Sequence, residues 1–564
     1  MRWSLTPKPN PVTVNQLADA LGVDTRIATL LVQRGISTYD EARQFFRPSL
    51  NDLHNPYLMK DMDKAVGRIE QAVANGERIL VFGDYDVDGT TAVSLMSGYL
   101  RSFYPNVDTY IPDRYGEGYG VSFAGINYAD DNGCTLIIAL DCGIKSPDKV
   151  AYANEKGIDF IICDHHRPGD TLPDAVAVLD PKRDDCHYPY DELCGAGVGF
   201  KLVQALAANR GQNILDLLPW LDLVATAIAA DIVPITGENR VLAKFGLDVI
   251  NTSPRAGIKA LIQNVKKQIL TISDVVFTIA PRINAAGRIS HGNHAVALLT
   301  EFDLPQAEAF AAQIETFNTD RKGLDKQITA EALLQIENNN DHDRKTTVVY
   351  HEEWHKGVIG IVASRLIETY YRPTLVFTKS GDKLAASARS VRDFDVYNAL
   401  EACADCLEQF GGHMYAAGLT LKEEQYETFR QKFEEVVAAT IPPELLIPEI
   451  KIDEEIDFSD ITPKFFRILK QFEPFGPGNM TPVFMTRNLR DTGYGKAIGS
   501  DSEHLKLYVK QENSESYGAI GFGLGKKTYL TCNGDTFDAA YSIEENEWNG
   551  EVKLQLRLRD VRCE

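Results

Sequence analysis

Residues 80–91 read Leu80-Val81-Phe82-Gly83-Asp84-Tyr85-Asp86-Val87-Asp88-Gly89-Thr90-Thr91, an apolar strand pattern that runs into three aspartates. Alternate residues of an extended segment point the same way, so Asp84, Asp86 and Asp88 would gather their carboxylates on one side of a strand end. Such crowding costs free energy unless a positive charge lies among the carboxylates. A divalent cation that takes oxygen ligands, Mg²⁺ or Mn²⁺, would supply that charge, and a solvated acidic loop is the alternative.

Strand and helix patterns alternate from about residue 61 to residue 180, which predicts a parallel sheet covered by helices. Sites in such sheets lie beyond the carboxyl ends of the strands. A single acid at a strand end can be a turn former. Here four predicted strands stop directly before an acid, and two histidines follow the third of these acids, which indicates a metal site. The residues are Asp84, Asp141, Asp164 with His165 and His166, and Asp180.

The composition is that of a globular protein with several domains, with 564 residues, 44% of them hydrophobic and 24% charged. The net charge of −22 argues against broad non-specific binding of nucleic acid, but it allows a local positive or metal-neutralised surface. No apolar run approaches the ~20 residues of a membrane span. Nine scattered cysteines suggest reduced thiols, so we expect a cytoplasmic protein without a membrane partner.

The rest of the chain predicts four further segments. A second α/β pattern and a final strand-rich region, typical of a small β-barrel, follow one long helical pattern. Within them, residues 281–288 predict a polar turn that carries two arginines, and Gly411-Gly412-His413 predict a glycine turn. The boundaries we predict are 1–60 for an N-terminal helical segment, 61–302 for the first α/β domain, 303–345 for the connecting helix, 346–441 for the second α/β domain and 449–564 for the barrel.

The motifs together resemble those of the DHH phosphoesterase superfamily, and within it the bacterial exonucleases specific for single strands. The resemblance covers nearly the whole chain, with the motifs in the family's order. It implies a DHH domain, a DHH-associated domain that faces it across a cleft, and a C-terminal OB-fold barrel. The matching motifs are 83–89, Asp141-Cys142-Gly143, Asp164-His165-His166, Asp180-Pro181, 284–288, 354–365, 387–390 and Gly411-Gly412-His413.

The resemblance also implies roles for individual residues. Two ions, Mn²⁺ or Mg²⁺, would be held by Asp84, Asp86, Asp88, Asp141, His165 and Asp231. Asp222 competes with Asp231 for the last place, and Asp84 either binds an ion or orients its neighbours. Catalysis would depend on Asp86, Asp88, Asp141, His165 and His166, with Asp164 and Asp180 supporting them. The substrate would contact Arg282, Asn284, Arg288, His355, Ser387, Arg389, Gly411, Gly412 and His413, and Ser387, Arg389 and Arg282 would hold a phosphate.

The implied activity is metal-dependent hydrolysis of single-stranded DNA from its 5′ end to mononucleotides, in DNA repair and recombination. Single-stranded DNA would be the substrate, and a single-strand-binding protein and a RecQ-type helicase are expected partners. The barrel would bind single strands by stacking. One alternative is a phosphodiesterase of short oligonucleotides or cyclic dinucleotides, and another is an inactive single-strand-binding scaffold. Candidate stacking residues are Phe472, Phe475, Phe484, Tyr508 and Tyr517.

Overall fold

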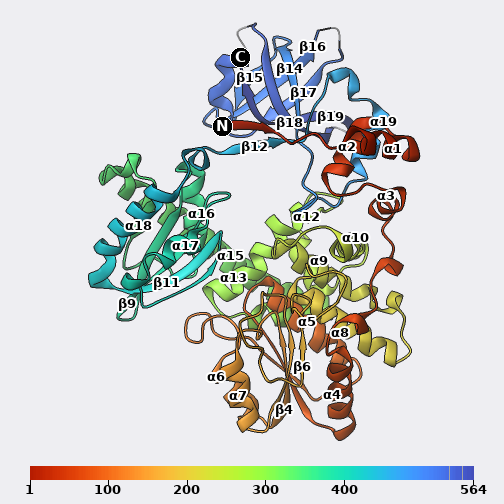
Figure 1. Ribbon diagram of the computed structural model, residues 1–564, viewed down its shortest axis with the longest axis vertical. Helices are drawn as coiled ribbons and strands as arrows, with labels where there is room; N and C mark the ends of the chain where they lie inside the picture. The colour runs from red at the N-terminus through yellow and green to blue at the C-terminus, as the bar shows by residue number, and fades with distance from the viewer. Residues whose placement is uncertain (513, 532–533, 549, 564) are drawn as a thin grey trace. The chain divides into compact units, whose positions relative to one another are not determined.

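The computed structural model describes residues 1–512, 514–531, 534–548 and 550–563. The chain divides into two compact units (Figure 1). One, called here the barrel unit, contains residues 1–52, 234–236 and 448–564, and the other, called the α/β unit, contains residues 53–233 and 237–447. Among the described helices, none is long and apolar enough to cross a membrane.

The first sheet of the α/β unit is parallel throughout, in the order β3-β2-β4-β5-β6. Its central strands are apolar at successive positions because helices cover both faces of a parallel sheet. Figure 1 shows α6 and α7 on one face and α4 and α8 on the other. The elements are β2 (Arg78–Gly83), β3 (Val107–Tyr110), β4 (Cys134–Leu140), β5 (Asp159–Cys163), β6 (Ala177–Leu179), α4 (Met62–Asn75), α5 (Val87–Arg101), α6 (Phe123–Asp131), α7 (Pro147–Glu155) and α8 (Gly195–Asn209).

A helical region follows, with α9 (Leu221–Ala230), α10 (Gly237–Thr252), α11 (Ala256–Ile262), α12 (Ile272–Asp274), a π-helical turn (Val275–Ile279), α13 (Ala280–Ile289) and α14 (Asn293–Thr300). The predicted polar turn at 281–288 is wrong, because these residues form α13. Pro281 lies in the first helical turn, where its missing N–H is no loss. Gly287 is needed because a Cβ there would lie 2.7 Å from the Tyr85 carbonyl oxygen.

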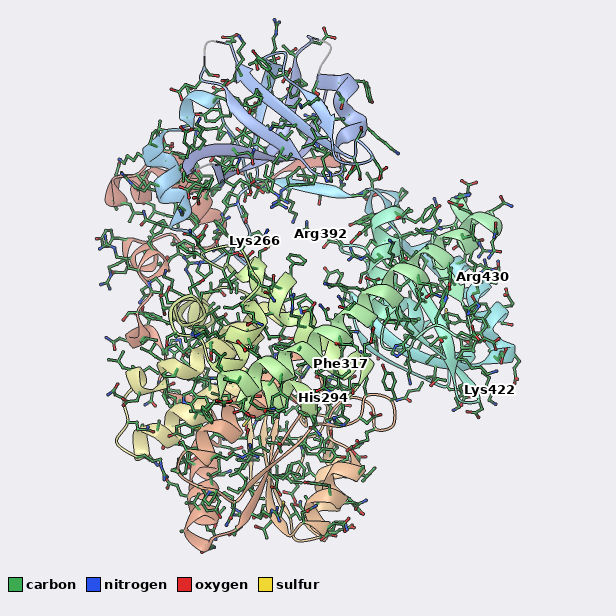
Figure 2. The ribbon with its side chains drawn as sticks, turned by 180° about the vertical axis from the view of Figure 1, so that it is seen from behind. Lys266, His294, Phe317, Arg392, Lys422 and Arg430 are labelled. Atoms are coloured by element: carbon green, nitrogen blue, oxygen red, sulfur yellow. The ribbon has the colours of Figure 1, made fainter. Side chains whose placement is uncertain are left out.

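The predicted connecting helix is α15 (Leu304–Asn338). His294 of α14 packs against Phe317 of α15, with ring centroids 5.3 Å apart (Figure 2). Farther along α15, Ile328, Ala332 and Ile336 enter the same apolar cluster as Val362 and Leu366 of α16 (Ile359–Thr369). The helix is therefore packed along its length on both α/β domains rather than exposed between them.

The second sheet has the order β10-β11-β9-β8-β7, with only β7 and β8 parallel. The predicted turn at Gly411-Gly412-His413 is wrong, because these residues lie in strand β10 beside β11. Gly412 has a φ of 147°, and a Cβ there would lie 2.4 Å from the Ala416 carbonyl oxygen. The elements are β7 (Thr347–Tyr350), β8 (Thr374–Ser380), β9 (Lys383–Arg389), β10 (Gln409–His413), β11 (Ala416–Lys422), α17 (Val396–Glu401) and α18 (Tyr426–Thr440).

The barrel unit closes as a five-stranded barrel, because β14 pairs with both β16 and β18. The order β14-β16-β17-β19-β18 is that of an OB-fold. The predicted fold class is thus confirmed, while the predicted domain boundaries stay predictions. The elements are β12 (Glu449–Ile452), β13 (Glu454–Glu455), α19 (Pro463–Lys470), β14 (Phe484–Asp491), β15 (Lys496–Ile498), β16 (His504–Gln511), β17 (Tyr517–Gly521), α20 (Thr528–Thr531), β18 (Phe537–Trp548) and β19 (Glu551–Arg562).

The N-terminal segment belongs to the barrel unit. Strand β1 (Arg2–Leu5) pairs in parallel with β12. Helices α1 (Pro11–Leu21), α2 (Thr25–Gln33) and α3 (Tyr39–Phe46) follow. Leu17, Ile27 and Leu31 are buried in the same core as Phe465 and Leu469 of α19. Residues more than 400 positions apart therefore build one core.

Candidate metal centre and substrate-binding residues

Acidic residues follow four neighbouring strands of the parallel sheet. Asp84 follows β2, Asp141 follows β4, Asp164 follows β5 and Asp180 follows β6. Each of these side chains is buried, with at most 2% exposed. Because the four strands are neighbours in the sheet, their acids gather at its carboxyl edge.

Asp86 and Asp88 lie at the N-terminus of α5 rather than on an extended segment, so the predicted alternation is wrong here. Asp86 is the N-cap residue and accepts a hydrogen bond from the Gly89 N–H at 3.0 Å. Asp88 lies in the first turn. Carboxylates are favoured in both positions, because the free N–H groups and the dipole of a helix make its N-terminus positive.

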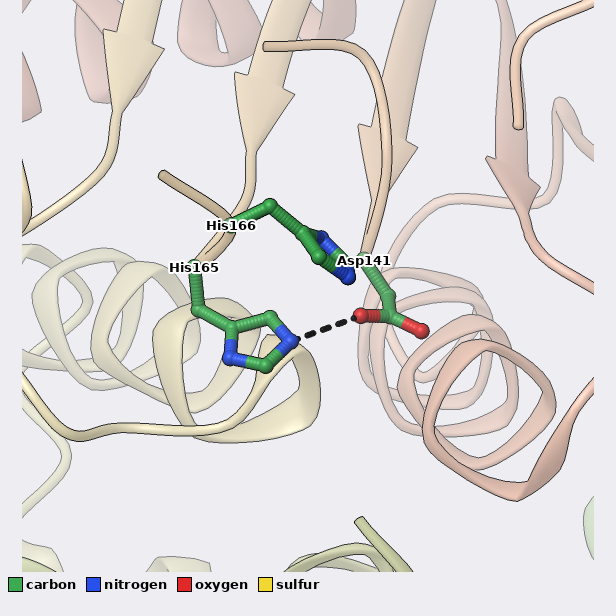
Figure 3. Close-up of side chains that lie close together, drawn as sticks. All are labelled: Asp141, His165 and His166. Atoms are coloured by element: carbon green, nitrogen blue, oxygen red, sulfur yellow. Dashed lines mark ion pairs between the residues drawn. The ribbon is translucent and has the colours of Figure 1, made fainter. Parts of the chain in front are cut away.

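His165 is the residue around which the acids converge. Its Nε2 atom lies 3.2 Å from Asp141 Oδ1, as Figure 3 shows, 3.6 Å from Asp231 Oδ2 and 3.9 Å from Asp88 Oδ2. Asp231 caps the C-terminus of α9. Two overlapping donor groups, Asp141–His165–His166 and Asp88–His165–Asp231, each place their ligand atoms within 4.8 Å of one another.

The N-terminus of α8 fixes Asp88. The N–H groups of Gly195 and Ala196 donate to the two oxygens of this carboxylate at 2.6 and 2.7 Å. A side chain at position 195 is excluded, because its Cβ would lie 2.5 Å from the Asp141 Cβ. The glycine at position 195 therefore lets two buried acids from different elements, Asp88 of α5 and Asp141 after β4, approach each other.

Asp164 forms hydrogen bonds with both histidines. It accepts hydrogen bonds from the backbone N–H groups of Ile144 at 3.0 Å and His165 at 2.8 Å. His166 Nδ1 lies 2.7 Å from the same carboxylate. Burial alone lowers the pKa of His166, but the bond to Asp164 and nearby carboxylates raise it to about 9. The other ring nitrogen of His166, Nε2, points away from Asp164. Because the ring is protonated at neutral pH, this nitrogen can donate a hydrogen bond.

Burial and the crowding of negative charge shift the pKa values of the other groups in the site. Burial and Asp86 raise the pKa of Asp88 to about 7, and burial and Asp88 raise that of Asp231 to about 9. Burial and the neighbouring carboxylates also raise the pKa of Asp141. Burial lowers the pKa of His165 to about 3, so its imidazole is neutral, the form that binds metals.

These donors fit a divalent metal ion. Among the described residues, Asp84 Oδ2, Asp141 Oδ1 and both ring nitrogens of His165 are buried without a hydrogen-bond partner. Such atoms cost free energy unless something binds them. A set of mostly carboxylate oxygens suits Mg²⁺ or Mn²⁺.

The other two acids considered from the sequence lie in different settings. Asp222 is fully buried and pairs with Arg255 at 2.9 Å, and it belongs to neither donor group. Asp180 accepts a hydrogen bond from the Lys182 N–H at 2.8 Å, and burial raises its pKa to about 7. Asp84 accepts a hydrogen bond from the Gly120 N–H at 3.1 Å.

A cluster of arginines gathers in the same α/β unit, and we call Arg114, Arg288, Arg321 and Arg389 the arginine cluster. Burial and the charges of Arg114 and Arg389 lower the pKa of Arg288 to about 9. Arg389 Nη1 donates to Ser387 Oγ at 3.1 Å, and Arg288 Nη1 donates to the Gly357 carbonyl oxygen at 2.9 Å. Within the described part of the chain, none of the four arginines pairs with a carboxylate in a salt bridge.

Other predicted substrate residues lie near this cluster. Burial lowers the pKa of His355, and the charge of Arg114 lowers it further. Partial burial, followed by the charges of Arg389 and His166, lowers the pKa of His413. Gly411 and Gly412 are exposed on β10, and Asn284 lies on α13. His355 and His413 are thus within electrostatic reach of the cluster.

Arg282 does not join Arg389 and Ser387. Its Nε pairs with Glu315 at 2.5 Å, and it lines a separate open pocket of about 670 Å³ beside α11, α13 and α15. Arg282 and Arg288 are six residues apart on α13, which puts them roughly 120° apart around a helix of 3.6 residues per turn. The two arginines therefore start from different faces of α13, and Arg282 pairs with Glu315 instead of joining the arginine cluster.

Most of the aromatic residues predicted to stack on bases lie in the barrel core. Phe472 and Phe484 are fully buried, Tyr517 is 9% exposed, and Phe475 packs against this core. Burial contradicts the prediction for Phe472, Phe484 and Tyr517, while the prediction for the partly buried Phe475 stays a prediction. Exposed aromatics of the described barrel residues are Tyr494, Tyr508, Phe522 and Tyr529. Lys506 lies 6.0 Å from the Tyr508 ring and Arg557 lies 5.4 Å from the Phe522 ring.

Sequence reasoning missed Arg114 and Tyr119, which lie in the loop between β3 and α6. Arg114 lies 4.5 Å from the Tyr85 ring, and the Tyr119 hydroxyl lies 3.2 Å from His166 Nε2. A signal was available, because the run Arg114-Tyr115-Gly116-Glu117-Gly118-Tyr119-Gly120 directly follows a predicted strand. Glycines there let backbone and aromatic side chains approach the site closely.

Comparisons with known proteins agree with this geometry. The family model for the N-terminal domain of the DHH family matches residues 78–228, the DHHA1 domain model matches residues 343–439, and the RecJ OB domain model matches residues 452–560. The fold is therefore that of the DHH class of proteins.

Comparisons with individual proteins show which family within the DHH class the chain belongs to. The chain is 37% identical to the single-stranded-DNA-specific exonuclease RecJ of Bacillus subtilis, over 100% of this chain and 71% of that protein. It is 35% identical to RecJ of Salmonella typhimurium, over 89% and 90%. A crystal structure of Thermus thermophilus RecJ with Mn²⁺ matches with a TM-score of 0.85 and 28% identity, covering 100% of this chain and 80% of that one. The chain belongs to the RecJ family of single-stranded-DNA-specific exonucleases.

The metal centre predicts a stability signature. Saturation with Mn²⁺ should stabilise the protein by about 2.7 kcal/mol at a hundredfold excess over the dissociation constant. Asp141→Asn removes a donor and relieves repulsion among buried carboxylates. We expect this variant without metal to be at least as stable as the unsubstituted protein, but to gain nothing from Mn²⁺. Calorimetric unfolding with and without Mn²⁺ measures both effects.

The control is Asp131→Asn, an exposed acid at the end of α6, which should keep the full increment. A gain from Mn²⁺ in Asp141→Asn equal to that of the unsubstituted protein would contradict the assignment.

Proposed function

We propose that this protein is a metal-dependent exonuclease that degrades single-stranded DNA from its 5′ end to mononucleotides. The observation that carries the proposal is the adjacency of two uncompensated charge clusters. Buried carboxylates crowd around His165, and among the described residues the arginine cluster forms no salt bridge with a carboxylate. A phosphodiester with divalent ions would neutralise both. The relatives, named single-stranded-DNA-specific exonucleases, support this substrate class.

The residues of the metal centre would have different roles in hydrolysis. Asp88, Asp141, Asp231 and His165 would hold two ions, which the two overlapping donor groups support. Bound divalent ions lower the pKa of water and neutralise charge on a scissile phosphate. His166, held by Asp164 through Nδ1, would donate from Nε2 to a phosphate oxygen. This donor is charged at neutral pH because its pKa is raised to about 9.

The arginine cluster would bind the 5′-terminal phosphate and so set the polarity of degradation. Planar guanidinium groups bind phosphate oxygens with paired donors. Arg288 is held where its charge is disfavoured, since burial and Arg114 lower its pKa. A dianionic end phosphate would relieve this cost more fully than an internal phosphate. Ser387, hydrogen-bonded to Arg389, adds a neutral donor beside the guanidinium.

The outward face of β16, β17 and β19 would bind the single strand farther along. In OB-folds the face of the second and third strands binds oligonucleotides, and these strands correspond to β16 and β17. Tyr508 is 42% exposed and Phe522 is 56% exposed. Lys506 and Arg557 beside their rings supply positive charge for the backbone. This local surface explains DNA binding by a chain of net charge −22.

The proposal extends to the setting of the reaction. A role in DNA repair and recombination, a cytoplasmic location, and a single-strand-binding protein and a RecQ-type helicase as partners follow from the family resemblance. They stay predictions.

His165→Ala tests the metal chemistry. Losing the central imidazole should lower kcat by roughly 10³-fold, about 4 kcal/mol of transition-state stabilisation. Affinity for single-stranded DNA should change little, because the arginine cluster and the barrel are intact. Cleavage of labelled oligonucleotides with Mn²⁺ and fluorescence anisotropy measure the two quantities. The exposed His187→Ala serves as the control. Turnover by His165→Ala at the normal rate would overturn the assignment.

Arg389→Ala tests the phosphate site. We expect KM for 5′-phosphorylated strands to rise roughly tenfold or more, since hydrogen bonds to charged groups contribute about 1.5–3 kcal/mol. Strands that end in a 5′ hydroxyl should be affected much less. Steady-state kinetics on both substrates give the comparison, and Arg43→Ala on α3, largely exposed, is the control. An equal effect on both strand ends would argue against this site.

Tyr508→Ala and Phe522→Ala test the barrel face. Each should weaken binding of a long single strand at least about fivefold, because stacking on an aromatic ring contributes about 1–3 kcal/mol per base. Hydrolysis of a dinucleotide should be unchanged, since its two nucleotides would be bound at the metal centre and the arginine cluster. Tyr39→Ala, an exposed tyrosine of α3, is the control. Unchanged long-strand affinity in both variants would exclude this surface.

A further inference from the structure

Tyr119 lies beside the metal centre, where its ring meets that of Tyr85 edge to face with centroids 6.1 Å apart. Its side chain is 53% exposed, so it belongs to no core. Its hydroxyl nevertheless lies 3.2 Å from His166 Nε2 and donates to the Asp141 carbonyl oxygen at 3.3 Å. The rings of Tyr119 and His166 meet edge to face, with centroids 5.9 Å apart. An exposed aromatic side chain thus places its only polar atom on a site histidine.

The loop that carries Tyr119 is held rigidly at its base. Asp113 Oδ1 accepts hydrogen bonds from the Tyr115 N–H at 2.9 Å and the Gly116 N–H at 2.6 Å. Glu117 accepts hydrogen bonds from the Tyr110 hydroxyl at 2.9 Å and from the Asp113 N–H at 2.8 Å. With its backbone fixed by these bonds, the loop delivers the Tyr119 hydroxyl at little entropic cost.

Two other residues of the same loop, Tyr115 and Gly120, contact residues of the two charge clusters. The Gly120 N–H donates to Asp84 Oδ1 at 3.1 Å. The Tyr115 hydroxyl donates to the Arg288 carbonyl oxygen, and its ring meets that of His355 with centroids 5.9 Å apart. The position of Tyr119 is therefore set by the residues that surround the metal centre and the arginine cluster.

The His166 imidazole has two nitrogens, and both have partners. Nδ1 is bound by Asp164 at 2.7 Å, which leaves the ring free to tilt about that bond. Nε2 meets the Tyr119 hydroxyl. A hydroxyl can accept a bond from a ring N–H and donate another at the same time. With the Asp141 carbonyl oxygen as its second partner, Tyr119 fixes the tilt of the ring relative to the strand that bears Asp141.

We propose that Tyr119 is a positioning residue for phosphodiester hydrolysis. In the protein without substrate its hydroxyl holds the His166 imidazole in the orientation from which the single Nε2–H passes to the scissile phosphate when substrate binds. The inference rests on the proposed function, because it assigns Tyr119 a role through His166. It requires that the hydroxyl, not the ring, carries the effect, and that the effect disappears when His166 is absent.

Tyr119→Phe removes only the hydroxyl. We expect kcat to fall roughly tenfold to a hundredfold, the range of hydrogen bonds to charged groups. KM and the stability gained from Mn²⁺ should stay within about twofold. In a double-mutant cycle, Tyr119→Phe should change nothing further in a His166→Ala background. Tyr152→Phe, which loses a hydroxyl bonded to Asn127 at 2.8 Å on the surface, should match the unsubstituted protein.

A second readout does not require activity. In metal-free protein labelled with ¹⁵N-histidine, Tyr119→Phe should shift the His166 Nε2 resonance, and Tyr152→Phe should not. Normal kcat in Tyr119→Phe, an additive loss in the double variant, or an unchanged His166 resonance would each overturn the inference. If the unsubstituted protein cleaves no DNA with Mn²⁺, the proposed function fails, and the resonance shift still decides whether Tyr119 orients His166.

Discussion

The mutual repulsion of the carboxylates around His165 is the constraint on which the site depends. Burial without compensation would drive these groups to take up protons, as the raised pKa values of Asp88, Asp141 and Asp231 indicate. The fold tolerates the crowding because the α8 N-terminus donates two N–H groups to Asp88. A divalent ion would complete the compensation. The parallel sheet brings the acids together by aligning the ends of neighbouring strands.

The positively charged arginine cluster lies in the same α/β unit as the carboxylates around His165. A phosphodiester bound with divalent ions would compensate the charge of both clusters. Arg288 and Arg389 are cations whose charged forms are disfavoured by burial and by Arg114. The two clusters form no salt bridge with each other among the described residues. Strand ends, α5 and α9 carry the acids, and the loop between β3 and α6, α13, α15 and β9 carry the arginines. A chain that is acidic overall can therefore bind a polyanion, since recognition depends on local charge rather than on the total.

The sequence located the strand-end acids correctly and failed where contacts between distant segments decide. Asp222 and Asp231 stand in one apolar stretch, but Asp222 pairs with Arg255, 33 residues beyond it, and Asp231 lies beside His165. Arg282 was expected to join Arg389, but α13 turns it to Glu315. Among the barrel aromatics, the register of each strand sends Phe484 inward and Tyr508 outward, and composition does not reveal that register.

The sequence by itself determined the parallel sheet, the acids at its carboxyl edge and the barrel, because hydrophobic periodicity and strand ends are local properties of the chain. Only the tertiary structure decided that the first 52 residues complete the barrel unit, that Asp231 meets His165, and that Arg114 and Tyr119 enter the site. These facts depend on pairings between segments tens to hundreds of residues apart. Such pairings follow from the packing of whole elements, which no local pattern of residues encodes.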